Sequence, residues 1–318
     1  MDNLTHGLTG ALMGQMGLKK KTGLGLVALI LGANLPDIDV VGLLWLDSSE
    51  ALGFRRGITH GPIGVVLLPI GLAALLWGFD RWQTRRGKRP QTRDPVRFIW
   101  LYVLGLIGAI SHTAMDWLNV YGVRLLYPFD TSWYYGDTLF IIDVWLWAIL
   151  ALGVWFSARA EKRGGADQRP AWFAMGAALV FVAANYAITF FDYNTGGRFR
   201  VPYPQRYISA PVPLQFWKRE HIAQFAGGRW NSSEWEGVLV EGGYRHSNTI
   251  QCELPDLESL RGGNSQLDGF LTWSRAPFAE GQSDGSIIMR DARFYDPLVR
   301  DRFSVALPDV ECVELPAD

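Results

Sequence analysis

Histidine and aspartate residues gather in four short motifs that lie within or beside segments apolar enough to cross a membrane. The motifs are Thr5-His6-Gly7, Asn34-Leu35-Pro36-Asp37-Ile38-Asp39, Arg56-Gly57-Ile58-Thr59-His60-Gly61 and Ser111-His112-Thr113-Ala114-Met115-Asp116. An ionisable side chain at membrane depth is energetically costly unless it is paired or binds an ion. A shared metal ion is the simplest single explanation for all four motifs.

Donor types and spacing support a metal site. His112 and Asp116 lie four residues apart and share one face of a helix, as two ligands of one ion do. Asp37 and Asp39 follow Pro36, which breaks its helix, and broken backbone at membrane depth lines polar cavities. The candidate ligands are His6, Asp37, Asp39, His60, His112 and Asp116. Because they offer only nitrogen and oxygen donors, we expect a divalent metal, with Zn favoured and Mn or Fe as alternatives.

Each candidate ligand also has a structural interpretation. A hydrogen bond between His112 and Asp116 could lock two helices together, and the two aspartates after Pro36 could form an interfacial turn. His6 and His60, each in a Thr-His-Gly string, could be packing residues. The metal hypothesis is preferred because one ion accounts for six residues that otherwise need separate explanations.

Further polar residues near the motifs could take part in chemistry. Arg56 could bind a phosphate or carboxylate beside the metal through its planar fork, or anchor the chain to lipid headgroups. An aspartate that does not bind the ion would serve as general base, and Asp39 and Asp143 are the candidates. A second set could orient the ligands or contact substrate, or simply form turns: Asn34, Asn119, Tyr121 and Asp137.

The chain divides into an apolar and a polar part. Residues 58–79, 98–118, 139–156 and 171–191 form apolar runs close to the roughly 20 residues that a bilayer span requires. A fifth run, 23–46, is interrupted at Pro36 and should be a broken helix, while 4–18 is short for a full span. We therefore expect an α-helical multi-pass membrane domain over residues 1–191, with about five to six segments. A soluble β-rich or α+β domain should follow over residues 192–318.

Lysine and arginine residues cluster in three loops, 19–21, 81–97 and 159–169, whereas the loops that alternate with these hold only Arg55, Arg56 and Arg124. If every run spans, the three clusters share one side, which the positive-inside rule assigns to the cytoplasm. The C-terminal domain is then extracytoplasmic, and periplasmic in a Gram-negative cell.

The same topology places the motifs near the outer surface. Asp37 lies about fourteen residues beyond Gly23, roughly 21 Å along a helix, in the outer half of the bilayer. The other motifs reach the same level, together with Asp137 and Asp143 at the start of the next helix. We therefore expect the motifs to form the rim of one open, water-accessible site.

The polar C-terminal part has strand-like stretches separated by turn signals, at residues 212–217, 235–240, 269–273, 286–294 and 302–307. Its two cysteines, Cys252 and Cys312, fall where a disulfide is permitted, and we expect them to pair. His221 and His246 have no partner at a spacing typical of metal ligands.

Several strings resemble the bacterial inner-membrane proteins described as membrane-bound metal-dependent hydrolases, the YdjM/YbcI-like family with LexA-regulated founding members. The strings are MDNLTHGLTG, NLPDID, RGITHGP, SHTAMDWLNVYGVRLLYPF and GDTLFIIDVWLW, in order over roughly the first 150 residues; FLTWSRAPFAE extends the similarity less distinctly. The resemblance implies an inner-membrane protein, His and Asp as metal ligands, and hydrolysis. By position, the family's motif residues are His6, Asp37, Asp39, Arg56, His60, His112, Asp116, Asp137 and Asp143. Gly61 stands where Ser is common in the family.

The leading hypothesis is a membrane-embedded, metal-dependent hydrolase at the outer leaflet of the inner membrane. A membrane lipid is the expected partner, and a phospholipid or lipid-linked phosphate or ester the expected substrate. One alternative is a non-enzymatic envelope or stress-response protein with a structural metal. A transporter is another, although the inner halves of the runs, such as 24–31, are nearly all apolar. The 30 basic and 31 acidic residues argue against nucleic-acid binding.

Overall fold

The structure is a computed structural model that describes residues 1–165, 168–200, 205–225, 228–235, 250–254, 256–308 and 310–315. Its contacts divide the chain into two compact units. The membrane unit comprises Met1–Asp39 and Arg56–Tyr186, and the C-terminal unit comprises Val40–Arg55 and Ala187–Asp318.

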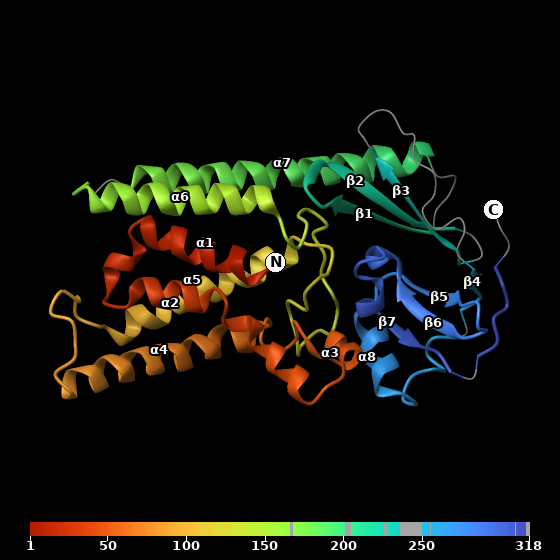
Figure 1. Ribbon diagram of the computed structural model, residues 1–318, viewed down its shortest axis with the longest axis horizontal. Coiled ribbons are helices and arrows are strands. Elements are labelled where there is room, and N and C mark those ends of the chain that lie inside the picture. Colours follow the sequence, from red (N-terminus) through yellow and green to blue (C-terminus); the bar gives the residue numbers. More distant parts are fainter. Residues whose placement is uncertain are drawn as a thin grey trace. The chain divides into compact units, whose positions relative to one another are not determined.

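The membrane unit is helical. Its helices are α1 (Asn3–Gln15), α2 (Gly25–Gly32), α4 (Pro62–Arg85), α5 (Phe98–Trp117) and α6 (Val144–Lys162), with the 3₁₀ segment η1 (Leu18–Lys21) (Figure 1). The 3₁₀ segment η2 (Leu35–Leu44) and helix α7 (Arg169–Arg200) begin in this unit and end in the C-terminal unit. Helices α4, α5 and α6 and residues Arg169–Asn194 of α7 are long and apolar enough to span a membrane. The pair α2 and η2 is bent by 52° and makes a fifth candidate, so the multi-pass fold and the helix broken near Pro36 are confirmed.

Small residues bring the helices of this unit together. A Cβ atom built on Gly10 of α1 would lie 2.7 Å from the Leu29 carbonyl oxygen of α2. On Gly32 it would lie 2.5 Å from the Gly105 carbonyl oxygen of α5, and on Gly108 2.5 Å from the Ala33 nitrogen. Glycine at these positions lets helix backbones approach closely, which is how helices associate in membranes. The end of α2 is thereby pressed against α5, one turn before His112.

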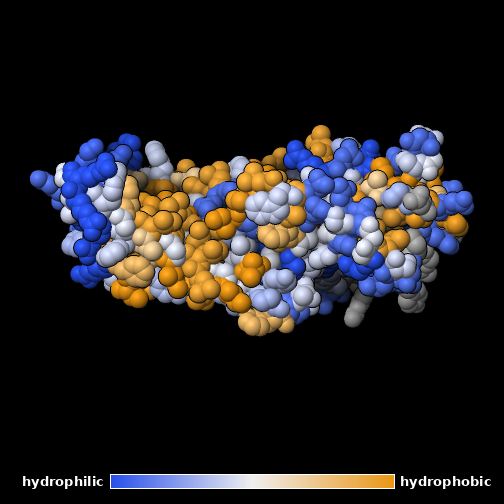
Figure 2. All heavy atoms as spheres, turned by 90° about the horizontal axis from the view of Figure 1, so that it is seen from below, coloured by the Kyte–Doolittle hydropathy of each residue, from blue (hydrophilic) through white to orange (hydrophobic). Residues whose placement is uncertain are grey.

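The three basic loops lie together at one end of the helices. Lys19 forms an ion pair with Glu161, the Gly23 nitrogen donates to Pro95 (3.2 Å), and the Arg97 nitrogen donates to the Thr22 hydroxyl (2.8 Å). The connections after α1, α4 and α6 meet at this end (Figure 1). Apolar side chains gather over the helical part and hydrophilic ones cover its end (Figure 2). The His and Asp motifs lie towards the opposite ends of α4 and α5.

The C-terminal unit combines helices with two antiparallel sheets, as an α+β domain should. The first sheet has the order β1 (Arg206–Val212), β2 (Gln215–Gln224), β3 (Trp230–Trp235). The second has the order β4 (Gln251–Cys252), β5 (Pro277–Gly281), β6 (Ile287–Asp291), β7 (Ser304–Ala306). Helices α3 (Ser48–Phe54) and α8 (Ser265–Trp273) pack together, and short 3₁₀ segments are η3 (Ala292–Phe294) and η4 (Arg300–Phe303). Cys252 and Cys312 form the expected disulfide.

The strand expected at 269–273 is wrong, because this stretch is the second half of α8. The Asn264 side chain accepts from the Gln266 and Leu267 backbone N–H groups and so starts a helix, and Leu267, Phe270 and Leu271 bury one helical face. Of the stretch 235–240, Trp235 is the last residue of β3 and the rest lies outside the described residues, as does His246. The other histidine of this part, His221, lies beside Asp192, with 2.7 Å between His221 Nε2 and Asp192 Oδ1.

Candidate metal centre

Helix α5 presents His112 and Asp116 on its buried face. His112 Nδ1 lies 2.7 Å from the Ala33 carbonyl oxygen. A carbonyl only accepts, so Nδ1 carries the proton and the Nε2 lone pair is left for a metal. The close approach at Gly108 brings the Ala33 carbonyl next to His112, because the end of α2 packs directly against α5 there.

His60 is held by a turn that precedes α4. Its backbone nitrogen donates to Gly57 (3.0 Å), and α4 begins at Pro62 with Gly61 as N-cap. A Cβ on Gly61 would lie 2.0 Å from the Tyr127 carbonyl oxygen, so the serine common in the resembling family would clash here. His60 Nδ1 is 2.9 Å from the Thr59 hydroxyl, which donates to Asp39 Oδ2 at 3.2 Å. Because the Thr59 hydroxyl donates to Asp39, it accepts from His60 Nδ1. Nδ1 therefore carries the proton, and the Nε2 lone pair is again available for a metal.

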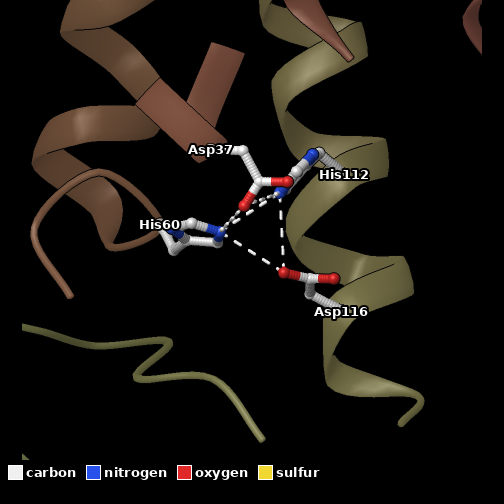
Figure 3. Close-up of side chains that lie close together, drawn as sticks. All are labelled: Asp37, His60, His112 and Asp116. Carbon is white, nitrogen blue, oxygen red and sulfur yellow. Dashed lines mark hydrogen bonds and ion pairs between the residues drawn. The ribbon is translucent and has the colours of Figure 1, made fainter. Parts of the chain in front are cut away.

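Four side chains meet at one point, from the bent segment, the turn before α4, and α5 (Figure 3). The two Nε2 atoms of His60 and His112 are 3.1 Å apart. Asp116 Oδ2 lies 3.3 Å from His60 Nε2 and 3.5 Å from His112 Nε2. Asp37 Oδ1 lies 3.8 and 3.9 Å from the same two nitrogens. All four ligand atoms lie within 4.8 Å of one another.

These residues fit a metal ion. A tetrahedral Zn²⁺ with bonds of about 2.0–2.1 Å separates its ligand atoms by about 3.3 Å, close to the distances between these donors. Two Nε2 atoms facing each other at 3.1 Å without a proton between them are both acceptors, and a cation between them removes that conflict. We therefore describe Asp37, His60, His112 and Asp116 as a buried cluster compatible with a metal site.

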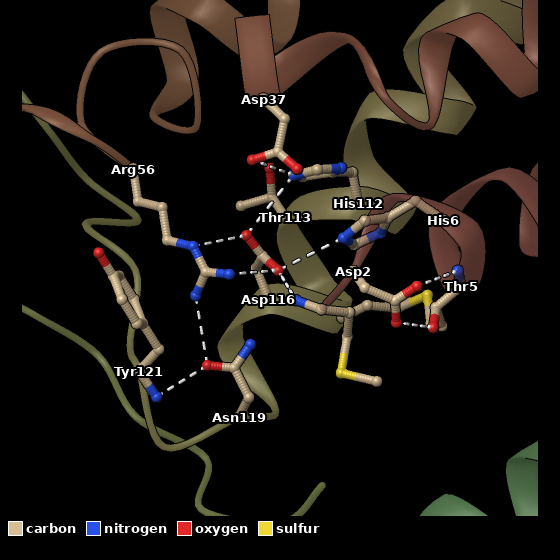
Figure 4. A network of polar contacts seen from close by, with 12 residues as sticks. Asp2, Thr5, His6, Asp37, Arg56, His112, Thr113, Asp116, Asn119 and Tyr121 are labelled. Atoms are coloured by element: carbon tan, nitrogen blue, oxygen red, sulfur yellow. Dashed lines mark hydrogen bonds and ion pairs between the residues drawn. The ribbon is translucent and has the colours of Figure 1, made fainter. Parts of the chain in front are cut away.

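Arg56 faces Asp116. Its Nε lies 3.0 Å from Asp116 Oδ2 and its Nη2 donates to Oδ1 at 3.1 Å, while Nη1 donates to Asn119 Oδ1 (3.2 Å) and the Gly122 carbonyl (2.9 Å) (Figure 4). The guanidinium stacks over Tyr121, 4.4 Å from the ring centroid. Asn119 and Tyr121 thus hold Arg56, which in turn orients Asp116.

Asp39 lies behind His60 and outside the four-residue cluster. Its Oδ2 is 3.5 Å from His60 Nδ1 and accepts the Arg56 backbone N–H at 2.7 Å. Arg56 has a φ of 54°, in the left-handed region that costs a non-glycine residue energy, and this hydrogen bond secures it. The Asp39 carboxylate therefore supports both His60 and Arg56.

His6 lies beside the cluster. Its ring stacks on His112 with centroids 3.7 Å apart, and its Nε2 is 3.4 Å from Asp116 Oδ1, which the Met1 amine also contacts. Neither ring nitrogen of this buried histidine makes a hydrogen bond with the described residues. The Asp2 side chain caps α1, and Trp147 donates to the Thr5 hydroxyl (2.8 Å), so the first helix is anchored where His6 meets α5.

The remaining predicted residues lie around the cluster. Asp143 is the N-cap of α6, where its Oδ1 accepts from the backbone of Trp145 and Leu146. Asp137 lies not at the helix start but in the preceding loop, with a φ of 48°. Asn34 Nδ2 donates to the Ile30 carbonyl at 2.9 Å.

Sequence reasoning missed Arg124. It is buried, and its guanidinium lies over the rings of Tyr127 (4.5 Å) and Trp133 (5.3 Å). Its backbone N–H donates to the Arg56 carbonyl (3.1 Å). Burial lowers the pKa of the Arg124 guanidinium. The available signal was an arginine among aromatic residues in a loop otherwise poor in positive charge.

The expected open rim is wrong. Among the described atoms, Asp37 is 8% exposed, His60 1%, and His112 and Asp116 0%. The loop after α5 covers this end of the helix, because Thr138 and Leu139 donate their N–H groups to the Leu118 carbonyl at 2.8 and 2.9 Å. The backbone of this loop therefore folds back onto the end of α5 that carries Asp116.

Comparisons with known proteins place the membrane part in a family. A family model described as YdjM inner membrane protein matches residues 1–194, more than half of the chain. The uncharacterized protein YfhP of Bacillus subtilis (strain 168) is 24% identical over 134 residues. That match covers 42% of this chain and 37% of YfhP, so the chain spans little more than a third of this relative. No solved structure matches the chain.

Proposed function

The chain belongs to the YdjM inner membrane protein family, and on this premise we propose that it is a membrane-embedded, metal-dependent hydrolase. The convergence of Asp37, His60, His112 and Asp116 supports the proposal more than any other observation. We propose Zn²⁺ as the ion, because two imidazoles and two carboxylates at these spacings suit it. A divalent ion, when bound, polarises a scissile group and lowers the pKa of a water molecule towards neutrality.

The chain's own residues hold and orient the ligand atoms. Thr59 and Asp39 fix the ring of His60, the Ala33 carbonyl fixes that of His112, and Arg56 fixes Asp116. Such supporting contacts keep ligands in the correct tautomer and direction. Since its fork is committed to Asp116, we assign Arg56 a positioning role. A general-base role for Asp39 or Asp143 stays a prediction, because Asp143 accepts helix-capping hydrogen bonds and Asp39 accepts hydrogen bonds from Arg56 and Thr59.

We propose that the substrate is a phospholipid or a lipid-linked phosphate or ester, cleaved at the outer leaflet. The three basic loops and the cluster lie towards opposite ends of the helices, and the positive-inside rule favours a cytoplasmic location for the loops. This topology would place the C-terminal unit outside the cytoplasm. Cysteines introduced at Thr92 and Ser283, both exposed, test it with a membrane-impermeant maleimide on intact cells. Labelling at residue 283 but not at 92 is expected, and the reverse pattern would contradict the topology.

Elemental analysis of the purified full-length protein tests the metal site. We expect stoichiometric metal in the wild type and its loss in His112→Ala and Asp116→Ala. Asp80→Asn is a matched control, because Asp80 is also a buried carboxylate, paired with Arg89 and Arg93 near the basic loops. Unchanged metal content in both cluster variants would refute the assignment. Hydrolysis is then tested on lipid phosphates and esters, with chelator-sensitive release of a product as the expected result.

A structural metal in a non-enzymatic envelope protein is the second candidate. All four ligands are buried, and closed four-ligand sites are typical of structural rather than catalytic zinc. This function predicts a large loss of thermal stability with chelator and no turnover. The hydrolase predicts turnover that stops with chelator while the helices stay folded.

A further inference from the structure

A substrate needs a route to the buried cluster, and the structure contains a groove that provides one. The groove lies between α4 and α5, has a volume of about 380 Å³, and reaches His60. Its walls include Val65 of α4 and Ile110, Ala114 and Trp117 of α5. Small-molecule sites typically measure about 300–1,000 Å³, so the groove is large enough for part of a ligand.

The walls of this groove are almost entirely apolar. Apart from His60, the polar lining residue is Thr113, and its hydroxyl donates to the Ala109 carbonyl of its own helix at 3.2 Å. That hydroxyl is thus already satisfied by its own helix. A groove of this composition favours a hydrocarbon over a polar ligand, because a polar group buried there without a hydrogen-bond partner is energetically costly.

The groove is continuous with the surface that faces lipid. Both α4 and α5 are candidate membrane spans, Ile110 is 53% exposed, and Val66, next to the groove, is 44% exposed. Figure 2 shows apolar side chains gathered over the helical part of the molecule. Trp117 is 39% exposed at the end of α5, where a tryptophan is typical of the boundary between hydrocarbon and headgroups. A ligand in the groove therefore approaches His60 sideways from the bilayer.

We propose that the groove between α4 and α5 binds one acyl chain of a membrane glycerophospholipid and so brings its headgroup to His60 and the buried cluster. Only the fate of the headgroup rests on the proposed hydrolase function. Binding of the acyl chain depends on the apolar walls and the lipid-facing opening.

The test uses a phosphatidylglycerol that carries a photoactivatable diazirine on one acyl chain. The full-length protein is reconstituted in phosphatidylethanolamine nanodiscs with a trace of this probe, irradiated, and mapped by mass spectrometry. Val65→Trp should fill the groove, whereas Val66→Trp adds the same bulk to the adjacent lipid-facing position and serves as the matched control. Ala114→Phe fills the groove from the opposite wall and guards against misfolding of the first variant.

In the wild type we expect labelling concentrated on the groove residues. Both filling variants should reduce it about tenfold, because the added side chain occupies the space of the acyl chain, and Val66→Trp should leave it unchanged. Even labelling over all lipid-facing helices, or equal labelling in Val65→Trp and Val66→Trp, would overturn the proposal. The proposal would also be overturned if detergent present during irradiation prevented groove labelling and unlabelled phosphatidylglycerol did not, because the groove would then hold an additive only.

The metal-site variant His112→Ala separates this proposal from the proposed function. Groove labelling that persists in this variant while hydrolysis is lost would support both the acyl-chain site and the metal-dependent hydrolase. Groove labelling in a wild-type protein that hydrolyses none of the tested lipids would support the acyl-chain site and refute the hydrolase. Hydrolysis of phosphatidylglycerol at the wild-type rate by Val65→Trp and Ala114→Phe would refute the groove as the substrate's site while leaving the hydrolase intact.

Discussion

Asp37 and Asp39 are two residues apart and chemically identical, yet the structure gives them different roles. Asp37 Oδ1 lies 3.8 Å from His60 Nε2 and 3.9 Å from His112 Nε2, on the side where both lone pairs point. Asp39 Oδ2 lies 3.5 Å from Nδ1, on the opposite side of the His60 ring. Substituting each with asparagine keeps its shape and removes its charge, so the two variants compare a direct ligand with a supporting carboxylate.

The expected magnitudes differ. A structural Zn²⁺ site contributes about 10–16 kcal/mol, or about 2.5–4 kcal/mol for each of four ligands. Asp37→Asn should therefore weaken binding by about 10²- to 10³-fold. Loss of a supporting partner typically costs about 10- to 100-fold, which is the expectation for Asp39→Asn. Both effects follow from the side of the His60 ring on which each carboxylate lies.

The assay is a competition for Zn²⁺ between the purified full-length protein and a chromophoric chelator. Asp80→Asn, remote from the cluster, should leave the dissociation constant unchanged. Thermal unfolding of the metal-free variants shows whether any change arises from misfolding. A larger loss of affinity in Asp39→Asn than in Asp37→Asn, with both folded, would refute the assignment of ligand and support.

Three further predictions concern stability. Replacing Cys252 and Cys312 with serine should destabilise the C-terminal unit by about 4 kcal/mol in denaturant unfolding, because the disulfide closes a loop of 60 residues. Gly108→Val should lower the thermal stability of the membrane unit by about 1–3 kcal/mol and weaken Zn²⁺ binding, since a Cβ there meets the backbone of α2. Burial would raise the pKa of Asp291, but the Arg293 guanidinium holds it below its usual value. The stabilisation from Asp291 is therefore complete above its unfolded pKa of about 3.9 and lost as pH falls through the lower folded pKa, a dependence that Asp291→Asn should remove from unfolding curves.

Controls and contrary outcomes are specific to each prediction. For the disulfide, a reducing agent should reproduce the effect in the wild type and leave the double variant unaffected; insensitivity of both would contradict it. Gly71→Val is the control for Gly108, because no atom lies within 4 Å of a Cβ at Gly71, and equal losses in the two would show that packing against α2 is unimportant. For Asp291, identical acid unfolding midpoints in wild type and variant would refute the linkage.

Much of the architecture was predictable because it depends on local properties. The length of each apolar run predicts a membrane span, and the interruption at Pro36 predicts that the span over residues 23–46 is broken. The four-residue spacing of His112 and Asp116 placed both on one helix face, which α5 buries. The second half of α8 was missed because its cap, Asn264, lies before the stretch that resembled a strand.

The sequence by itself determined which residues were available for a metal site and which helices carry them. Only the tertiary structure decided that Asp37 joins His60, His112 and Asp116 while Asp39 supports from behind, and that Arg56 turns towards Asp116. It also decided that the four side chains are buried and that the loop after α5 folds back onto the end of that helix. The physical reason is that spans and helix faces follow from periodicity within one segment. The meeting of side chains depends on backbone contacts between segments, such as Gly108 against Ala33, which neither segment specifies alone.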